Sequence, residues 1–124
     1  MAAAMYAARL GMKTLVLGHT YGPEAPVGGV ITTTHVVENY PGFISISGQE
    51  LAKKIEEHVR AYKEVNIKNE RATAVNKIVN GFLVKTNKDE YTGKTILFAT
   101  GTKWRKLPES ILGSREFEGR GISY

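Results

Sequence analysis

Residues 51–62 repeat apolar side chains at helical spacing, with charged residues on the opposite face. This pattern is typical of an amphipathic helix that packs one side against a core. We interpret the charged residues between positions 53 and 60 as a solvated face. Ser47 and Glu50 form a capping box at the start of this helix. In such a box the serine oxygen accepts from the backbone amide of Glu50, and the Glu50 side chain reaches back to the backbone amide of Ser47. The stripe consists of Leu51, Ile55, Val59 and Tyr62.

A second helix is predicted at the start of the chain. Residues 1–10 are rich in alanine, the strongest helix former, and Gly11 follows as a C-terminal cap. The sequence offers no residue to cap the first turn, so we expect that an upstream segment is missing. The apolar run 14–17 suits a parallel strand covered on both faces, and 65–68 suits another short strand. Between them, residues 18–29 form a loop that contains Pro23 and Pro26.

An antiparallel meander is predicted in the second half of the chain. The strand-like segments 75–79 and 82–86 flank Asn80-Gly81, the preferred dipeptide of a two-residue hairpin. A turn at 87–90 leads into Tyr91, and the apolar run 94–99 predicts a further strand that stops at Thr100. The tail from residue 102 shows no regular pattern. The order of elements predicts an α/β fold.

Composition narrows the class of protein. The length of 124 residues suits a single domain, 1–124. Hydrophobic residues make up 42% of the chain and charged residues 23%, which is close to the average of globular proteins. The net charge of +5 is dispersed, and no apolar run is long enough for a transmembrane helix. Cysteine is absent, which excludes disulfides, thiolate metal sites and cysteine nucleophiles within this sequence.

Candidate chemistry is sparse when it is judged from the residues alone. A helix that leads into a buried strand is half of a βαβ unit, but the glycine-rich turn that would hold a pyrophosphate is absent. Gly18 stands where such units often carry an acid, and Glu24 is the nearest acid in the loop. The three histidines share no metal-ligand spacing, so we predict no metal site. No paired carboxylates, Ser/His/Asp grouping or P-loop can be assembled, so we predict no catalytic residue. The segment 103–106 places Trp104 among cations, which permits weak nucleic-acid binding but more simply indicates a surface loop.

A set of short motifs, taken in order, is more informative than periodicity. Together they resemble the FAD-binding domain of low-molecular-weight thioredoxin reductases of bacteria and archaea, over essentially the whole chain. The most specific parts are 37–42 and 119–123. The motifs are Ala7-Ala8-Arg9-Leu10-Gly11, Gly28-Gly29, Thr32-Thr33-Thr34, Val37-Glu38-Asn39-Tyr40-Pro41-Gly42, Ser47-Gly48, Ala99-Thr100-Gly101 and Gly119-Arg120-Gly121-Ile122-Ser123.

The resemblance implies an enzyme of the pyridine nucleotide-disulfide oxidoreductase family. Such proteins have two Rossmann-like domains, and the FAD domain contains an inserted three-stranded meander, here at about residues 72–99. Hydride passes from NADPH to FAD, and electrons then pass through a Cys-x-x-Cys pair to thioredoxin or a similar disulfide protein. NADPH would bind outside this chain. The resemblance further implies a cytoplasmic homodimer without nucleic-acid or membrane partners.

The same resemblance implies a set of residues around FAD. Gly18 and Ala72 fall near the adenosine, and Thr100 and Gly101 near the adenosine and pyrophosphate. The other positions, on the flavin side, are Gly28, Gly29, Val30, Thr34 and Asn39.

The sequence departs from the family pattern in four ways. Val30 replaces the usual Gln after the glycine pair, and Gly18 replaces the acid of many relatives. The first strand with its glycine-rich loop is absent, and the chain stops at Tyr124, where the Cys-x-x-Cys would begin. We therefore expect a partial FAD-binding domain, truncated at both ends and inactive alone, with open sheet edges and marginal stability or a compensating partner. The alternatives are a cofactor-free remnant that acts as an interaction module, and the flavodomain of a related ferredoxin-NADP reductase.

Overall fold

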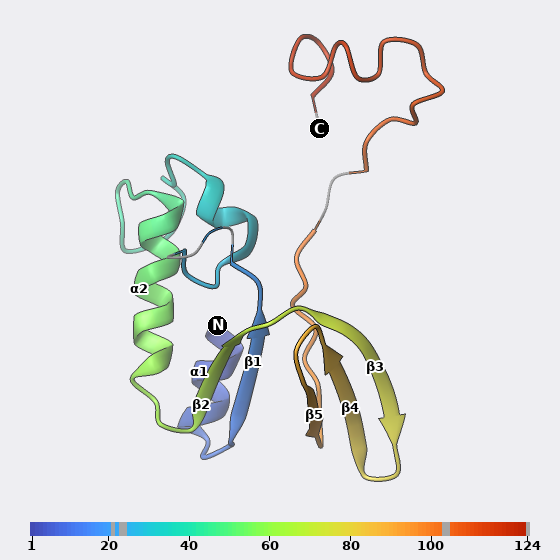
Figure 1. Ribbon diagram of the computed structural model, residues 1–124. Coiled ribbons are helices and arrows are strands. Elements are labelled where there is room, and N and C mark those ends of the chain that lie inside the picture. The colour runs from blue at the N-terminus through green and yellow to red at the C-terminus, as the bar shows by residue number, and fades with distance from the viewer. Residues whose placement is uncertain (21, 23–24, 103–104, 124) are drawn as a thin grey trace.

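The computed structural model describes residues 1–20, 22, 25–102 and 105–123. Two sheets lie side by side, a parallel pair with helices and an antiparallel sheet of three strands (Figure 1). This arrangement confirms the α/β class and the inserted meander. The predictions that concern Pro23, Glu24, Lys103 and Trp104 fall outside the described residues.

The first helix ends as its sequence predicts. α1 spans Ala2–Arg9, and Gly11 follows at a φ of 77°. The Gly11 amide donates to the Ala8 carbonyl at 2.8 Å, and the Met12 amide donates to the Ala7 carbonyl at 3.0 Å. This pair of bonds is the Schellman motif, which satisfies the last carbonyls and favours glycine at the left-handed position.

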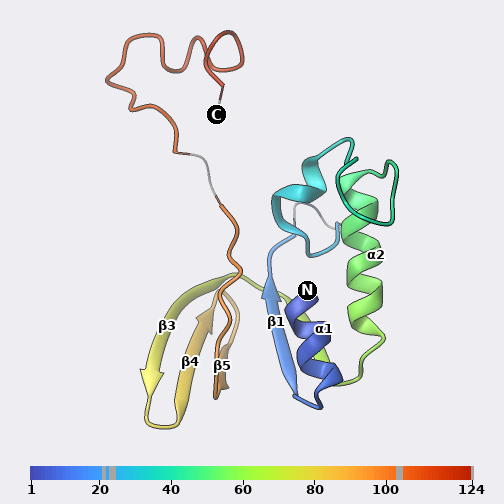
Figure 2. The same cartoon turned by 180° about the vertical axis from the view of Figure 1, so that it is seen from behind.

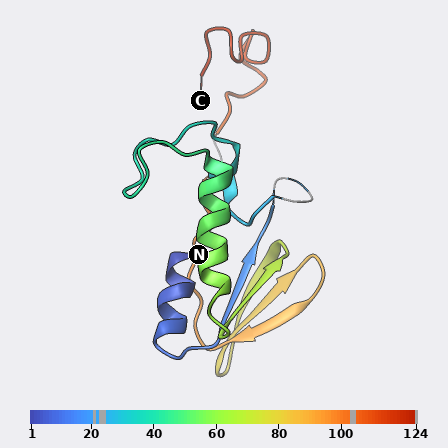
Figure 3. The same ribbon diagram turned by 90° about the vertical axis from the view of Figure 1, so that its left-hand side faces the viewer.

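The two short apolar strands pair in parallel. β1 (Thr14–Gly18) and β2 (Val65–Asn69) run in register from Thr14 opposite Val65 to Gly18 opposite Asn69. Both helices lie on the same side of this sheet (Figure 3). The packing brings Ala4, Val59 and Ile67 into one buried cluster.

The second helix, α2, spans Gly48–Arg60 and begins at the predicted cap. The Glu50 amide donates to Ser47 Oγ at 3.1 Å, as predicted. The Glu50 carboxylate does not reach back to the Ser47 amide in the described chain and instead lies 3.8 Å from Lys54 Nζ. Leu51 and Val59 of the predicted stripe are buried at 3% and 1% exposure, while Tyr62 lies beyond the end of the helix. Leu51 also belongs to a second buried cluster with Val37 and Ile46. The helix therefore organises two cores, one near each end.

A short 3₁₀ helix, η1 (Gly29–Thr33), occupies a segment for which the sequence predicts no regular element. It contacts α2 at the end where α2 begins (Figure 2). The hydroxyls of Thr32 and Thr33 donate to carbonyls three residues earlier, at 2.8 Å each. These local bonds help to satisfy the backbone carbonyls of a single helical turn. The sequence shows no apolar periodicity that would predict this turn.

The meander consists of β3 (Ala72–Ile78), β4 (Gly81–Thr86) and β5 (Glu90–Gly93), all antiparallel. The hairpin turn is one residue earlier than predicted, since Ile78 pairs with Gly81 and the turn residues are Val79 and Asn80. Gly81 instead opens β4 at a φ of 145°, where a Cβ would lie 2.2 Å from the Gly93 carbonyl oxygen. The glycine is thus required by the close approach of β5.

The predicted strand at 94–99 is wrong. The chain is irregular there, and Leu97 and Phe98 are 69% and 68% exposed. No backbone hydrogen bond among the described residues involves positions 95–99. An apolar run forms a strand only beside a partner that satisfies its amides and carbonyls. Residues 105–123 form turns with an isolated bridge between Glu118 and Ile122, so the predicted irregular tail is confirmed over that part.

Candidate cofactor site

The carboxyl ends of the parallel strands form one edge of the parallel sheet. β1 ends at Gly18 and β2 at Asn69, directly opposite each other. The Glu70 amide donates to the Gly18 carbonyl at 3.0 Å, and Asn69 Nδ2 donates to Thr20 Oγ1 at 2.9 Å. In α/β folds ligands bind outside this edge, because loops there leave backbone groups and helix ends open to a ligand.

The segment that carries the glycine pair sits above this edge and packs on α2 (Figure 1). A Cβ on Gly48 would lie 1.8 Å from the Ile31 carbonyl oxygen, so only glycine allows η1 to approach the start of the helix. The Gly48 amide donates to the Thr34 carbonyl at 3.0 Å. At Gly28 a Cβ would lie 2.6 Å from Ala52 Cβ. The space at Gly28 is therefore taken by the protein itself, whereas a Cβ at Gly29 would meet open space.

Glu56 anchors the loop that leads into this segment. Its Oε2 accepts from the Val27 amide at 2.7 Å, and its Oε1 accepts from Arg60 Nε at 2.7 Å. The Glu56 side chain is only 14% exposed, so at this position the prediction of a solvated face is wrong. The sequence gives no signal for this contact, because the amide lies 29 residues from the carboxylate.

The flavin-side positions are accessible. Val30 is 42% exposed within η1, and Thr34 is exposed as the residue that ends it. Asn39 is exposed in the turn that follows the isolated bridge between Val37 and Ile46. The structure thus leaves the Thr34 and Asn39 side chains at exposed positions.

The adenosine-side positions are brought together only in part. Ala72 begins β3 opposite Thr86, two residues after the amide that bonds Gly18. Thr100 and Gly101 are exposed and follow the irregular segment 94–99. No hydrogen bond within the described part of the chain reaches either of them. The structure therefore links Gly18 to Ala72 but leaves the later pair unattached.

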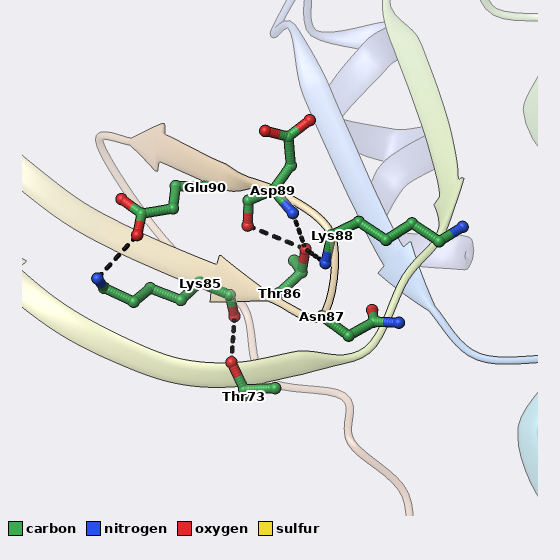
Figure 4. Close-up of a pocket in the computed structure, with 7 residues that line it drawn as sticks. All are labelled: Thr73, Lys85, Thr86, Asn87, Lys88, Asp89 and Glu90. Carbon is green, nitrogen blue, oxygen red and sulfur yellow. Dashed lines mark hydrogen bonds and ion pairs between the residues drawn. The ribbon is translucent and has the colours of Figure 1, made fainter.

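Two surface depressions lie away from the predicted cofactor positions. A shallow depression of about 380 Å³ lies over the β4–β5 turn (Figure 4), where Lys85 Nζ lies 2.7 Å from Glu90 Oε1. Another is formed by residues between 109 and 116. Neither is lined by any of the nine predicted cofactor positions.

Within residues 1–20, 22, 25–102 and 105–123, no three His, Cys, Asp or Glu side chains gather where they could hold a metal ion. In the same ranges, no helix has both the length and the hydropathy to cross a membrane.

Comparison with known proteins shows the family to which the chain belongs. Residues 1–124 match the family described as pyridine nucleotide-disulphide oxidoreductase, and the chain belongs to that family.

Among individual relatives, the chain is similar to thioredoxin reductases. It is 32% identical to that of Bacillus subtilis, with 100% of this chain and 37% of the relative aligned. It is 39% identical to that of Ureaplasma parvum, with 100% and 38% aligned. The crystal structure of Lactococcus lactis thioredoxin reductase superposes with a TM-score of 0.76 at 37% identity, covering 98% of this chain and 38% of that one. The resemblance found in the sequence is confirmed, and the chain spans well under half the length of these relatives.

Proposed function

We propose that this chain forms the FAD-binding part of an NADPH-dependent thioredoxin-disulfide reductase. The observation that carries the proposal is the family match over residues 1–124, combined with the position of Gly18, η1 and Ala72 around the carboxyl edge of the parallel strands. That edge is where an α/β sheet binds a dinucleotide. The proposal includes thioredoxin or a similar disulfide protein as the partner and a cytoplasmic homodimer as the assembly, and the family match supports both.

The residues present suit FAD in their chemistry. Thr34 and Asn39 offer an exposed hydroxyl and an exposed amide on the flavin side, and the open space at Gly29 allows close approach to the backbone. Gly18 and Ala72 offer backbone groups to the adenosine, and Thr100 and Gly101 would join them. Val30 offers an apolar contact in place of a side-chain amide.

The role of this chain in the reaction is to bind and orient. Bound here, FAD would supply the chemistry of accepting a hydride from NADPH and delivering two electrons to a disulfide. The 124 residues contain no cysteine, so the dithiol that relays these electrons has to come from outside them. We therefore propose that residues 1–124 alone do not reduce a disulfide.

The test uses the protein expressed at the full length of its reading frame, with the 124-residue chain alone in parallel. We expect stoichiometric FAD and NADPH-dependent reduction of oxidised thioredoxin from the former, and neither from the latter. An Asn39→Ala variant should bind FAD about fivefold more weakly, as expected for one lost hydrogen bond. Asn66→Ala, at an exposed position on β2, is the matched control and should bind normally. A full-length protein without FAD would refute the proposal.

A second candidate is an interaction module without cofactor. The exposed Leu97 and Phe98, and the single neighbour of each parallel strand in the described chain, favour it. It predicts a concentration-dependent dimer and no flavin absorbance, which sedimentation and an absorption spectrum would show. A flavodomain of the ferredoxin-NADP reductase kind would instead bind FAD and exchange electrons with ferredoxin, and it would not reduce thioredoxin.

A further inference from the structure

Glu70 is a buried carboxylate that none of the proposed FAD contacts uses. It is 7% exposed and lies between β2 and β3. Its Oε2 accepts from Thr86 Oγ1 at 2.7 Å, and Tyr91 Oη donates to Oε1 at 2.8 Å and to Oε2 at 2.9 Å. A buried charge is costly without such donors, so this cluster fixes the ends of β4 and β5 to one side chain.

The ionisation states of Glu70 and Tyr91 favour the hydrogen bond between them at neutral pH. The Thr86 hydrogen bond lowers the pKa of Glu70 most; burial opposes it, and the Tyr91 bond and the charges of Lys68 and Lys88 lower it further. Burial and the bond to Glu70 raise the pKa of Tyr91 to about 12, with the charges of Glu70 and Asp89 adding to the shift. The carboxylate is thus ionised and the phenol protonated, as the hydrogen bond requires.

The backbone around Glu70 is attached at its other side to the parallel sheet. Its amide donates to the Gly18 carbonyl at 3.0 Å. The next residue exchanges two bonds with the turn after β4: the Arg71 amide donates to Asn87 Oδ1 at 2.8 Å, and the Asn87 amide donates to the Arg71 carbonyl at 3.0 Å. Residues 70 and 71 therefore join the end of β1 to the meander.

We infer that Glu70 is a positioning residue that sets Ala72 relative to Gly18 at the adenosine end of the site. Ala72 follows two residues later and pairs with Thr86, the same residue that bonds the carboxylate. The inference rests on the proposed function, because both positions matter only if they meet the cofactor. Glu70 acts through them, since its carboxylate is buried and already occupied by Thr86 and Tyr91.

The test is FAD affinity and stability, measured together on the protein at the full length of its reading frame. Glu70→Gln keeps the shape but removes the charge, and we expect the Kd for FAD to rise about tenfold, as when one charged hydrogen bond is lost. Tyr91→Phe should weaken binding in the same direction, and the double variant should be less than additive. Val59→Ala, on the buried face of α2, is the control that lowers Tm while leaving the Kd unchanged.

The outcomes separate the possibilities. An unchanged Kd in Glu70→Gln, or an equal loss in Val59→Ala, would overturn the positioning role and leave a merely structural one. Faster hydrogen exchange at the Glu70 and Arg71 amides in Glu70→Gln, without change at the Val16 amide, would support the attachment independently of FAD. A wild-type protein that takes up no FAD would refute the proposed function and the cofactor role of Glu70 with it, while the exchange data would still report on the joint.

Discussion

The unit formed by α1, α2, β1 and β2 and the β3–β5 meander are held in place by different interactions. The first buries two apolar clusters, both of which include residues of α2. Every residue from 71 to 80 is exposed, and hydrogen bonds of Asn69, Glu70 and Arg71 join the meander to the rest. Apolar burial is non-directional and distributed, whereas hydrogen bonds are directional and few. The position of the meander should therefore depend on a handful of atoms, and that of the helical unit on many.

The largest effect is expected in the core of the helical unit. Leu51→Ala removes a side chain that is 3% exposed and should lower the free energy of unfolding by about 3 kcal/mol. Leu97→Ala makes the same chemical change at a side chain 69% exposed and should alter it by less than about 0.5 kcal/mol. Urea unfolding measures both. Equal losses would show that segment 94–99 is packed in solution and would remove the contrast.

A second prediction concerns the contact between η1 and α2. Gly48→Ala places a Cβ 1.8 Å from the Ile31 carbonyl oxygen, so the segment has to move, at a cost of about 1–3 kcal/mol. We expect FAD binding to weaken together with stability, because Thr34 moves with η1. Gly93→Ala is the matched control, since its Cβ would lie 3.4 Å from the nearest atom. Normal FAD binding by Gly48→Ala would show that η1 does not contribute to the site.

A third prediction separates the two regions by pH. Because the pKa of Glu70 is lowered from 4.5 in the folded state, its contribution to stability is present above about pH 4.5 and is lost as the pH falls through the lowered value. Tyr91, with its pKa raised to about 12, loses its contribution as the pH rises from 10 to about 12. Residue-resolved hydrogen exchange at low pH should show the meander opening before β1 and β2. Glu70→Gln should abolish the acid-side difference, and simultaneous opening of both regions in the wild type would contradict it.

The smallest effect is expected at the start of α2. Ser47→Ala removes the acceptor of the Glu50 amide and should cost about 1 kcal/mol. Ser45→Ala, at an exposed position outside the helix, should be neutral. Thermal unfolding measures both, and a loss confined to the helical unit would sharpen the contrast with the meander. A neutral Ser47→Ala would show that the packing of α2 stabilises its first turn without the cap.

Local elements were determined by the sequence itself. The Schellman ending at Gly11, the cap at Ser47 and the hairpin between β3 and β4 each depend on residues within a few positions of one another. Such interactions form wherever the local pattern occurs, so the helices, β1, β2 and the meander were predicted in the correct order. The family resemblance likewise follows from short motifs in order along the chain.

Tertiary structure decided what depends on distant neighbours. Residues 94–99 have the composition of a strand but form no backbone hydrogen bond in the described chain, because a ladder needs an adjacent strand. The hairpin turn lies one residue earlier than predicted, and Gly81 is the position that β5 approaches closely. Glu56 and Glu70 became anchors through contacts 29 and 16 to 21 residues away, distances at which a sequence pattern carries no signal. The helices and the hairpin thus depend on local sequence. The arrangement of Gly18, Glu70 and Ala72 depends instead on how the two sheets pack together.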